Sequence, residues 1–407
     1  MLLDFTHFHE RSTHSKSCYS NLNDFGIICA MQNPFRYGAK VTGGAFYDRR
    51  EIKASIINVI DGCNNAVLYG PRRYGKSSLV AEIIEELSGK GVVCVYMNMM
   101  DIASLGDFIV EYSKAVAAKT APVTSMLKHL VGLFSRVRPV LGVGDDGKPE
   151  LSLSFAASKP GVAELREALE LPEKLRPKGS RMLIVIDEFQ EVAELGLGAN
   201  FERVMRSVIE NHAEISYVFL GSKTHLLKRM FAKPSRPFYR SAQIFSLGLP
   251  PSDESRVFLI ERFRSVGMKL SDVVARKMTK LSGNVPYYLQ ELGSWVFRNV
   301  SERGGKEVRE ADVDTGYSQM AEAERDLFES FFRQMPESQR LVARALATEP
   351  TGVFTADYRL RHFLPMLSTV STAVRRLVAD SQIDSVDGVY RLIDPLFANH
   401  LRRAGKA

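Results

Sequence analysis

The sequence Gly70-Pro71-Arg72-Arg73-Tyr74-Gly75-Lys76-Ser77, followed by Ser78, decides the fold of this chain. It matches the pattern G-x-x-x-x-G-K-[ST], in which backbone N–H groups of a glycine-rich loop and of the following helix face phosphate oxygens. The apolar residues 66–69 precede it like a buried strand, and residues 79–87 follow it like an amphipathic helix. Because strand, loop and helix occur in the order that this loop requires, the sequence predicts nucleoside triphosphate binding.

The polar residues of the loop have separate expected tasks. Lys76 can reach the β- and γ-phosphates, and the Ser77 hydroxyl can join the oxygen shell of Mg²⁺. Glycines allow the chain to wrap closely around an anion. A chance glycine-rich turn is the alternative, and the matching strand and helix argue against it. The predicted nucleotide-binding residues of the loop are Gly70, Pro71, Arg72, Arg73, Tyr74, Gly75, Lys76, Ser77 and Ser78.

A second motif follows just over a hundred residues later. The continuous apolar run 182–186 is typical of a parallel strand covered on both faces, and it ends in Asp187 and Glu188. Acidic residues at the carboxyl end of such a strand face the crevice where open α/β sheets bind ligands. We expect Asp187 to hold Mg²⁺ and Glu188 to orient and deprotonate an attacking water. An acidic strand-to-loop turn is the simpler alternative.

Two further polar residues follow the next expected strands. Ser222 comes after the apolar run 215–221, where it could sense the γ-phosphate or cap the next helix. Arg240 lies in a basic stretch before residues 244–247, where it could approach the γ-phosphate or the nucleotide of a neighbouring subunit. A solvated basic loop is an equally good interpretation of Arg240.

Composition bounds the remaining possibilities. The 407 residues suffice for two or three domains, and 45% hydrophobic with 25% charged residues is ordinary for a globular chain. No run approaches the ~18–20 apolar residues of a membrane span, and the first 30 residues do not read as a secretory signal. Four scattered cysteines are typical of a reduced, cytoplasmic protein. The net charge of +7 permits contact with nucleic acid without requiring it.

The C-terminal region has the pattern of a winged helix. In residues 368–383 the apolar positions fall at i, i+3, i+4, i+7 and i+8, and residues 383–393 alternate around Gly388 like a two-stranded wing. Arg375 and Arg376 would lie on the exposed face of the recognition helix, where they could contact DNA. Against DNA, ten Lys and Arg in residues 336–407 face seven acids, two of them in the wing turn. A module that packs on the rest of the protein is the alternative.

These motifs together resemble the STAND-type P-loop ATPases, archaeal-type relatives of the AAA+ proteins. Residues 46–52 resemble the family's opening element, which implies that Phe46 and Arg49 lie near the nucleotide base. Residues 283–286 resemble the G-x-x-P turn of the family's lid. The resemblance implies ATP as the nucleotide and places Pro286 against it. Two features depart from related proteins. Many AAA+ proteins have an arginine close to this turn that acts as a second sensor, whereas the next arginine here is Arg298. Larger STAND proteins carry a repeat array after the lid, and none follows it here.

The sequence therefore predicts an α/β fold with a parallel P-loop sheet, a helical lid and a winged helix. We expect an N-terminal extension at 1–32 that is disordered or added by start-site choice, an ATPase core at 33–250, a lid at 251–325 and a winged helix at 326–407. Residues 122–160 read as a surface insertion, either a partner contact or decoration. Within it, a turn signal at 144–147 precedes residues 150–155, which alternate as a strand or hairpin would.

The expected activity is slow Mg²⁺-dependent ATP hydrolysis that serves as a conformational switch, with a possible protein partner or self-association. The alternatives are a DNA-binding ATPase of initiator or transposition-helper type and a non-hydrolysing scaffold that holds nucleotide.

Overall fold

The computed structural model describes residues 32–120, 137–143, 149–155, 160–195, 198–386 and 388–404. Almost all of the predicted N-terminal extension lies outside these residues. In the described part of the chain, no helix has the length and apolar character needed to cross a bilayer.

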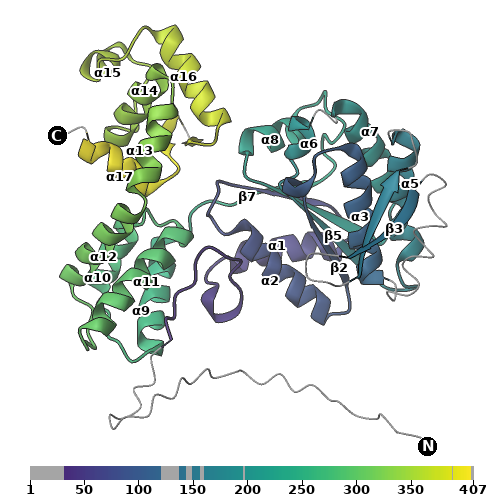
Figure 1. Ribbon diagram of the computed structural model, residues 1–407, viewed down its shortest axis with the longest axis horizontal. Coiled ribbons are helices and arrows are strands. Elements are labelled where there is room, and N and C mark those ends of the chain that lie inside the picture. The colour runs from purple at the N-terminus through teal and green to yellow at the C-terminus, as the bar shows by residue number, and fades with distance from the viewer. Residues whose placement is uncertain are drawn as a thin grey trace, which may run out of the picture.

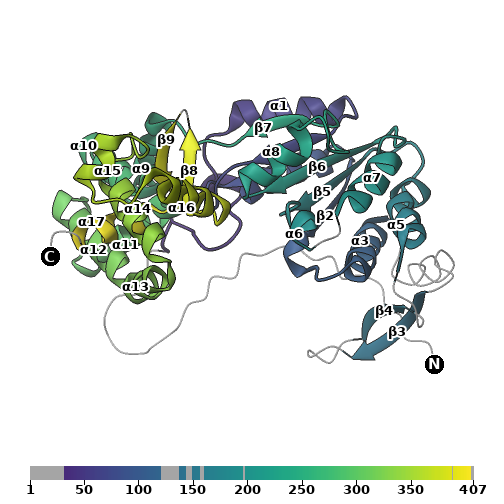
Figure 2. The ribbon, with the colours of Figure 1, turned by 90° about the horizontal axis from the view of Figure 1, so that it is seen from above.

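A five-stranded, fully parallel sheet forms the centre of the core (Figures 1 and 2), as the sequence predicts. The strands lie in the order β2-β5-β6-β1-β7, so that β1 runs between β6 and β7. The carboxyl ends of parallel strands meet at one edge of a sheet. The loops after β1, β5 and β6 therefore open onto the same crevice. The strands are β1 (Ala66–Tyr69), β2 (Val93–Asn98), β5 (Met182–Asp187), β6 (Ile215–Gly221) and β7 (Gln243–Ser246).

Helices cover both faces of this sheet. Successive strand residues point to opposite faces, so Val67 and Ile184 join one apolar cluster while Leu68 and Val185 join the other. Helices α1 and α2 complete one face, and α3, α5, α7 and α8 complete the other. The helices are α1 (Arg50–Asp61), α2 (Lys76–Gly89), α3 (Leu105–Thr120), α5 (Val162–Leu175), α6 (Glu191–Glu194), α7 (Gly198–Ile209) and α8 (Thr224–Ala232), with short 3₁₀ helices η1 (Gly43–Ala45) and η2 (Met99–Asp101).

The predicted insertion contains an antiparallel hairpin that stands apart from the main sheet (Figure 2). It pairs β3 (Val137–Val143) with β4 (Pro149–Phe155), so the alternating pattern at 150–155 does form a strand. The turn signal at 144–147 falls outside the described residues.

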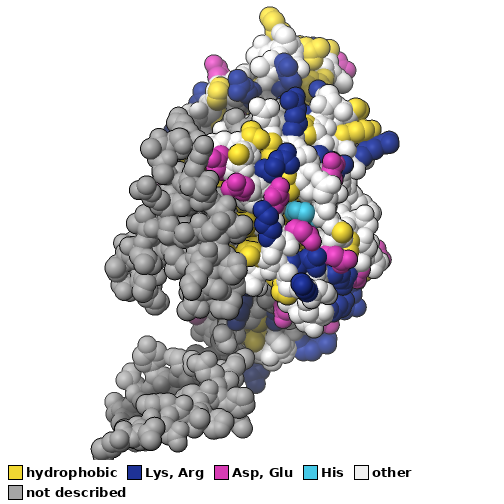
Figure 3. Space-filling view, turned by 90° about the vertical axis from the view of Figure 1, so that its right-hand side faces the viewer, with side chains coloured by type: hydrophobic (Ala, Val, Ile, Leu, Met, Phe, Trp, Pro, Cys, Tyr) yellow, Lys and Arg dark blue, Asp and Glu magenta, His cyan; other side chains and the backbone are white. Residues whose placement is uncertain are grey.

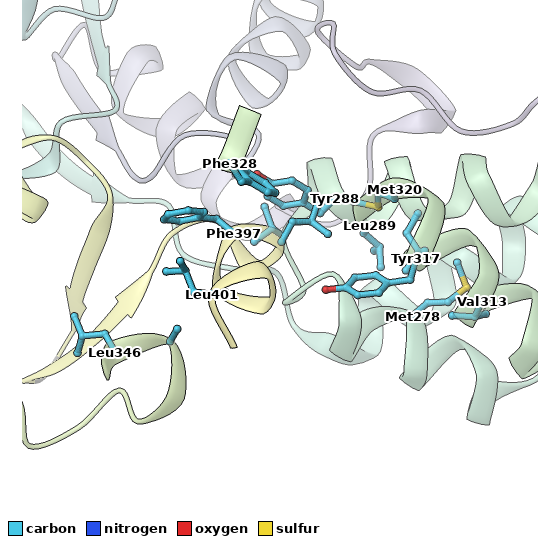
Figure 4. Packing of buried hydrophobic residues seen from close by; sticks show 14 of the residues in the cluster. Met278, Tyr288, Leu289, Val313, Tyr317, Met320, Phe328, Leu346, Phe397 and Leu401 are labelled. Carbon is cyan, nitrogen blue, oxygen red and sulfur yellow. The ribbon is translucent and has the colours of Figure 1, made fainter. Parts of the chain in front are cut away.

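The lid and the winged helix share one hydrophobic core (Figure 4). Tyr288 and Leu289 of the lid belong to the same cluster as Leu346 and Leu401 of the winged helix. A Cβ at Gly283 of the lid would lie 3.0 Å from the side chain of Pro395 in the winged helix, so the two parts pack closely there. Because buried apolar contacts run without a break between them, these two parts form one packed body.

This second body is helical apart from the wing. The lid comprises α9 (Ser252–Ser265), α10 (Asp272–Leu281), α11 (Pro286–Glu302) and α12 (Glu310–Ala323). The winged helix comprises α13 (Arg325–Gln334), α14 (Glu337–Thr348), α15 (Ala356–Arg361), α16 (Leu367–Ala379), β8 (Ile383–Val386), β9 (Val389–Leu392) and α17 (Pro395–Ala404). The antiparallel wing and the buried face of α16 agree with the sequence prediction.

Residues 33–43, here called the strap, connect the lid to the core. The Asn33 side chain donates to the Ser294 hydroxyl at 2.8 Å, and Phe35 is buried in the lid cluster. Further along the strap, the Gly43 N–H donates to Glu82 of α2 at 2.6 Å. The strap is therefore fixed to both bodies.

The close approach of Phe35 to Gly293 generates a prediction. A Cβ at Gly293 would lie 2.6 Å from the Phe35 ring, so Gly293→Ala must displace the strap although alanine favours a helix. We expect a loss of about 1–3 kcal/mol in the free energy of unfolding, measured by urea denaturation. Gly89→Ala, also in a helix but with open space at its Cβ, is the control and should be neutral or stabilising. Equal stabilities of the two variants would contradict this role for Phe35.

Candidate nucleotide-binding site

A cavity of about 500 Å³ lies between the core, the strap and the lid, at the carboxyl edge of the sheet. Most of the predicted nucleotide-binding residues line it, and Gly70, Pro71, Ser222 and Arg240 do not. Its volume is in the range of small-molecule sites in proteins. The predicted residues on its wall are Phe46, Arg49, Arg72, Arg73, Tyr74, Gly75, Lys76, Ser77, Ser78, Asp187, Glu188 and Pro286.

The glycine-rich loop has the backbone expected of an anion cradle. Gly75 has a left-handed φ of 92° and precedes α2, which begins at Lys76, so the N–H groups of the first helical turn face the cavity. A Cβ at Gly70 would lie 2.5 Å from the Leu247 carbonyl, so a side chain there would push β1 and the residue after β7 apart.

Lys76 is buried beneath the loop. Its Nζ donates to the carbonyls of Gly70 and Pro71 at 2.7 and 2.9 Å, so these two residues act in the site through Lys76. Burial lowers the pKa of Lys76 to about 8, while Glu188 and Asp187 oppose this shift. A bound phosphate would add negative charge beside the ammonium and favour its protonated form.

Ser77 and Asp187 come together although 110 positions separate them in the chain. The Ser77 hydroxyl donates to Asp187 Oδ2 at 3.0 Å, and both residues line the cavity. A hydroxyl and a carboxylate are hard oxygen donors of the kind that Mg²⁺ prefers, and Mg²⁺ is usually held by one or two protein oxygens together with substrate phosphates. The residue set therefore fits a magnesium ion.

Glu188 is held at the end of β6. Its Oε2 accepts from the Ser222 N–H at 3.2 Å, from the Ser222 hydroxyl at 2.9 Å and from the Gln190 amide. Burial raises the pKa of this carboxyl, but these hydrogen bonds and Lys76 lower it below its usual value overall. Glu188 is thus an ionised group at the cavity wall, as a base for water requires.

The remaining predicted residues occupy different places. Arg49 has a left-handed φ of 73° and donates to the Gly248 carbonyl at 2.7 Å, which ties the start of α1 to the link between core and lid. Phe46 packs against the apolar cluster of α1 and α2, and Pro286 begins α11 at the cavity wall. Arg240 is exposed outside the cavity with its guanidinium 5.2 Å from the Tyr239 ring centre. Arg298, which the sequence did not assign to the site, stacks on Trp295.

Sequence reasoning missed the contact between the loop and the winged helix. Arg73 Nη1 donates to Asp394 Oδ2 at 3.0 Å, and its guanidinium lies 4.8 and 4.9 Å from the ring centres of Tyr287 and Tyr288. Tyr288 also donates to the same Asp394 oxygen. The other oxygen, Oδ1, accepts from the Leu396 and Phe397 N–H groups and so caps α17. One side chain of the phosphate loop therefore contacts both the lid and the winged helix.

The predicted DNA-contacting residues are exposed on α16. Arg375 donates to Thr372 of its own helix at 3.3 Å, and both Arg375 and Arg376 are open to solvent. On the opposite side of the molecule, the visible part of the core carries both charge signs side by side (Figure 3). The described residues visible on that face therefore form no broad single-sign field of the kind that attracts a polyanion.

The arrangement defines a P-loop NTPase fold with a parallel sheet of strand order β2-β5-β6-β1-β7, a helical lid and a C-terminal winged helix. Residues 46–292 match a family described as an ATPase domain predominantly from Archaea, and residues 326–403 match a probable winged helix domain. Because the first match covers more than half of the chain, the chain belongs to this archaeal-type ATPase family.

One solved structure shows the same fold. The chain resembles a Walker-type ATPase of Pyrococcus abyssi at 18% identity and a TM-score of 0.61, over 91% of this chain and 99% of that one. Lower TM-scores relate it to two proteins of Aeropyrum pernix: ORC2 with ADPNP and ADP (11% identity, 0.47, 93% and 99% covered) and ORC1 in complex with DNA (15%, 0.48, 89% and 94%). A search of curated proteins found no match.

A buried acid on helix α11 of the lid leads to a prediction about how stability depends on pH. Glu291 of α11 is 7% exposed, and burial together with Glu324 raises its pKa from 4.5 to about 7, with Asp394 adding to the shift and Arg73 opposing it. Between pH 4.5 and 7 the folded protein keeps a proton that the unfolded chain releases, so this group removes stability as the pH rises through that window.

Glu291→Gln should therefore be more stable than the wild type above pH 7 and should flatten the fall in stability over this window. Urea unfolding at pH 5, 6, 7 and 8 measures the effect. Glu302→Gln, an exposed acid on the same helix, is the control and should keep the wild-type slope. If Glu291→Gln kept that slope as well, the raised pKa would be refuted.

Proposed function

We propose that this protein is an ATPase whose slow, Mg²⁺-dependent hydrolysis of ATP acts as a conformational switch of the STAND type. The proposal rests mainly on one observation: the phosphate loop lines the cavity and also contacts the winged helix. Lys76 and Ser77 lie at the cavity where phosphates would bind, while Arg73 of the same loop bonds to Asp394 of the winged helix. Occupancy of the cavity and the position of the winged helix therefore depend on one short segment.

The chemistry follows from the residues at the cavity wall. Lys76 and the loop N–H groups would bind the β- and γ-phosphates, and Ser77 and Asp187 would hold Mg²⁺, which when bound neutralises charge on the phosphate oxygens. Glu188 would orient a water for in-line attack on the γ-phosphorus and accept its proton. Ser222 would act through Glu188, because its hydroxyl bonds to that carboxylate instead of lining the cavity.

The switch follows from competition for Arg73. Arginine binds phosphate oxygens through the same N–H groups that it offers a carboxylate. Because Arg73 lies at the cavity wall, a γ-phosphate would draw the guanidinium away from Asp394 and weaken the hold on α17. Loss of the γ-phosphate on hydrolysis would restore that contact, which is a common form of nucleotide switch. DNA contact by Arg375 and Arg376, self-association and a role for Arg240 in a neighbouring subunit stay predictions.

The catalytic part of the proposal is tested by Glu188→Gln. We expect Mg²⁺-dependent phosphate release from ATP to fall by about 100-fold or more, because a general base contributes 10²–10⁴-fold. ATP binding, followed in parallel by fluorescence of a labelled nucleotide, should stay close to the wild type. Binding without turnover in both proteins would favour the non-hydrolysing scaffold, and equal turnover would exclude Glu188 as the base.

The switch is tested by hydrogen exchange in the first turn of α17. In the Glu188→Gln background, we expect several-fold faster exchange there with ATP than with ADP, and Arg73→Ala should remove that difference at saturating nucleotide. Arg361→Ala is the matched control, because its ion pair with Glu349 stays within the winged helix. A nucleotide response that survived in Arg73→Ala would disprove this route.

A further inference from the structure

We propose that Tyr96 is a positioning residue for the metal-holding carboxylate of Asp187, and that Lys40 of the strap holds Tyr96 in place. The inference rests on the proposed function, because it concerns how the same site would bind magnesium. It adds two residues that no sequence motif marks, one on β2 and one on the strap.

The carboxylate of Asp187 accepts hydrogen bonds from three donors. Its Oδ1 accepts from the Glu188 N–H at 2.9 Å, and its Oδ2 accepts from Ser77 at 3.0 Å and from the Tyr96 hydroxyl at 2.7 Å. A carboxylate offers about four lone-pair sites, so these three donors fix its plane and leave about one site unused. Of the three donors, Tyr96 alone comes from a different strand and from outside the two nucleotide motifs.

The position of Tyr96 suits this task. Strand β2 pairs in parallel with β5, and the Tyr96 side chain lines the cavity. Its phenolic O–H donates to Asp187 Oδ2, a role that a phenol keeps at neutral pH. Groups that hydrogen-bond to a metal-ligating carboxylate change metal affinity by about 10–100-fold when they are removed.

Lys40 links this donor to the strap. Its Nζ lies 3.6 Å from the centre of the Tyr96 ring, a cation–π contact. On one side of Lys40, the Arg36 N–H donates to Gln290 of the lid at 3.1 Å; on the other, the Val41 N–H donates to Ser78 of α2 at 3.0 Å. Successive contacts therefore join the lid, the strap, Tyr96 and Asp187, so the fit of the metal site depends on how the strap lies.

The test measures metal-dependent binding as well as turnover. In the Glu188→Gln background, the dissociation constant of a fluorescent ATP analogue is measured in EDTA and across a Mg²⁺ titration. We expect Tyr96→Phe to bind the analogue in EDTA within twofold of the parent and to need about tenfold more Mg²⁺ for half-maximal tightening. With Glu188 restored, half-maximal phosphate release should need more Mg²⁺ by the same factor, with little change in kcat at saturating metal.

Two controls separate positioning from folding. Tyr112→Phe removes a buried tyrosine hydroxyl that bonds to Tyr217 away from the cavity, and should leave the Mg²⁺ requirement unchanged. Lys40→Ala, a change at an exposed residue, should raise the Mg²⁺ requirement less than Tyr96→Phe does, and Lys40→Arg should restore it because arginine keeps the cation–π contact.

The outcomes are distinct. An unchanged Mg²⁺ requirement in Tyr96→Phe would overturn the inference and leave the proposed function standing. An equal loss of affinity in EDTA and in Mg²⁺, together with a lower Tm, would overturn it in favour of a structural role. If the parent protein bound the analogue neither in EDTA nor in Mg²⁺, both the proposed function and this inference would be overturned.

Discussion

The parallel pairing of β1 between β6 and β7 is the constraint on which the site depends. Together with the pairing of β5 and β6, it sets the ends of β1, β5 and β6 at one edge, so that the phosphate loop, Asp187 and Ser222 meet although more than a hundred residues separate the first from the others. The approach of Gly70 to the Leu247 carbonyl shows how closely these ends pack. Without that register, the hydroxyl of Ser77 and the carboxylate of Asp187 would have no reason to share a hydrogen bond.

A second relation follows from the loop's place between two bodies. The sheet and its helices have their own two apolar clusters, whereas the lid and the winged helix share a third. Polar contacts join the bodies, namely Arg73 with Asp394, Arg49 with Gly248, and the strap at its two ends, while Tyr47 of the core adds a ring contact with α9. Polar contacts can be exchanged for contacts with phosphate or water at small net cost, whereas opening an apolar core cannot. The candidate nucleotide site thus lies beside contacts that can rearrange more easily than an apolar core.

The sequence allowed the fold class and much of the candidate site to be predicted, because both depend on local patterns. An apolar strand, a glycine-rich turn and a helix are contiguous, and Asp187 is the last residue of its strand. Tyr96 and Asp394 could not be found this way, since they reach the site from positions 91 and 321 residues away from their partners. Ser222 was placed at the right strand end, but its bond to Glu188 depends on the left-handed backbone of Glu188, with a φ of 52°, which no residue type there signals.

The shared core of the lid and the winged helix bears on how such proteins can be recombined. Sequence families divide the chain between residues 292 and 326, yet one apolar cluster holds both Tyr288 and Leu401 and so runs across that boundary. A chimaera joined there would pair two half-interfaces that had never adapted to each other and would leave mismatched apolar surface. The residues after β7, where Leu247 leads into the lid, offer a better junction. Packing therefore groups the lid and the winged helix into one unit, whereas the sequence families place their boundary inside it.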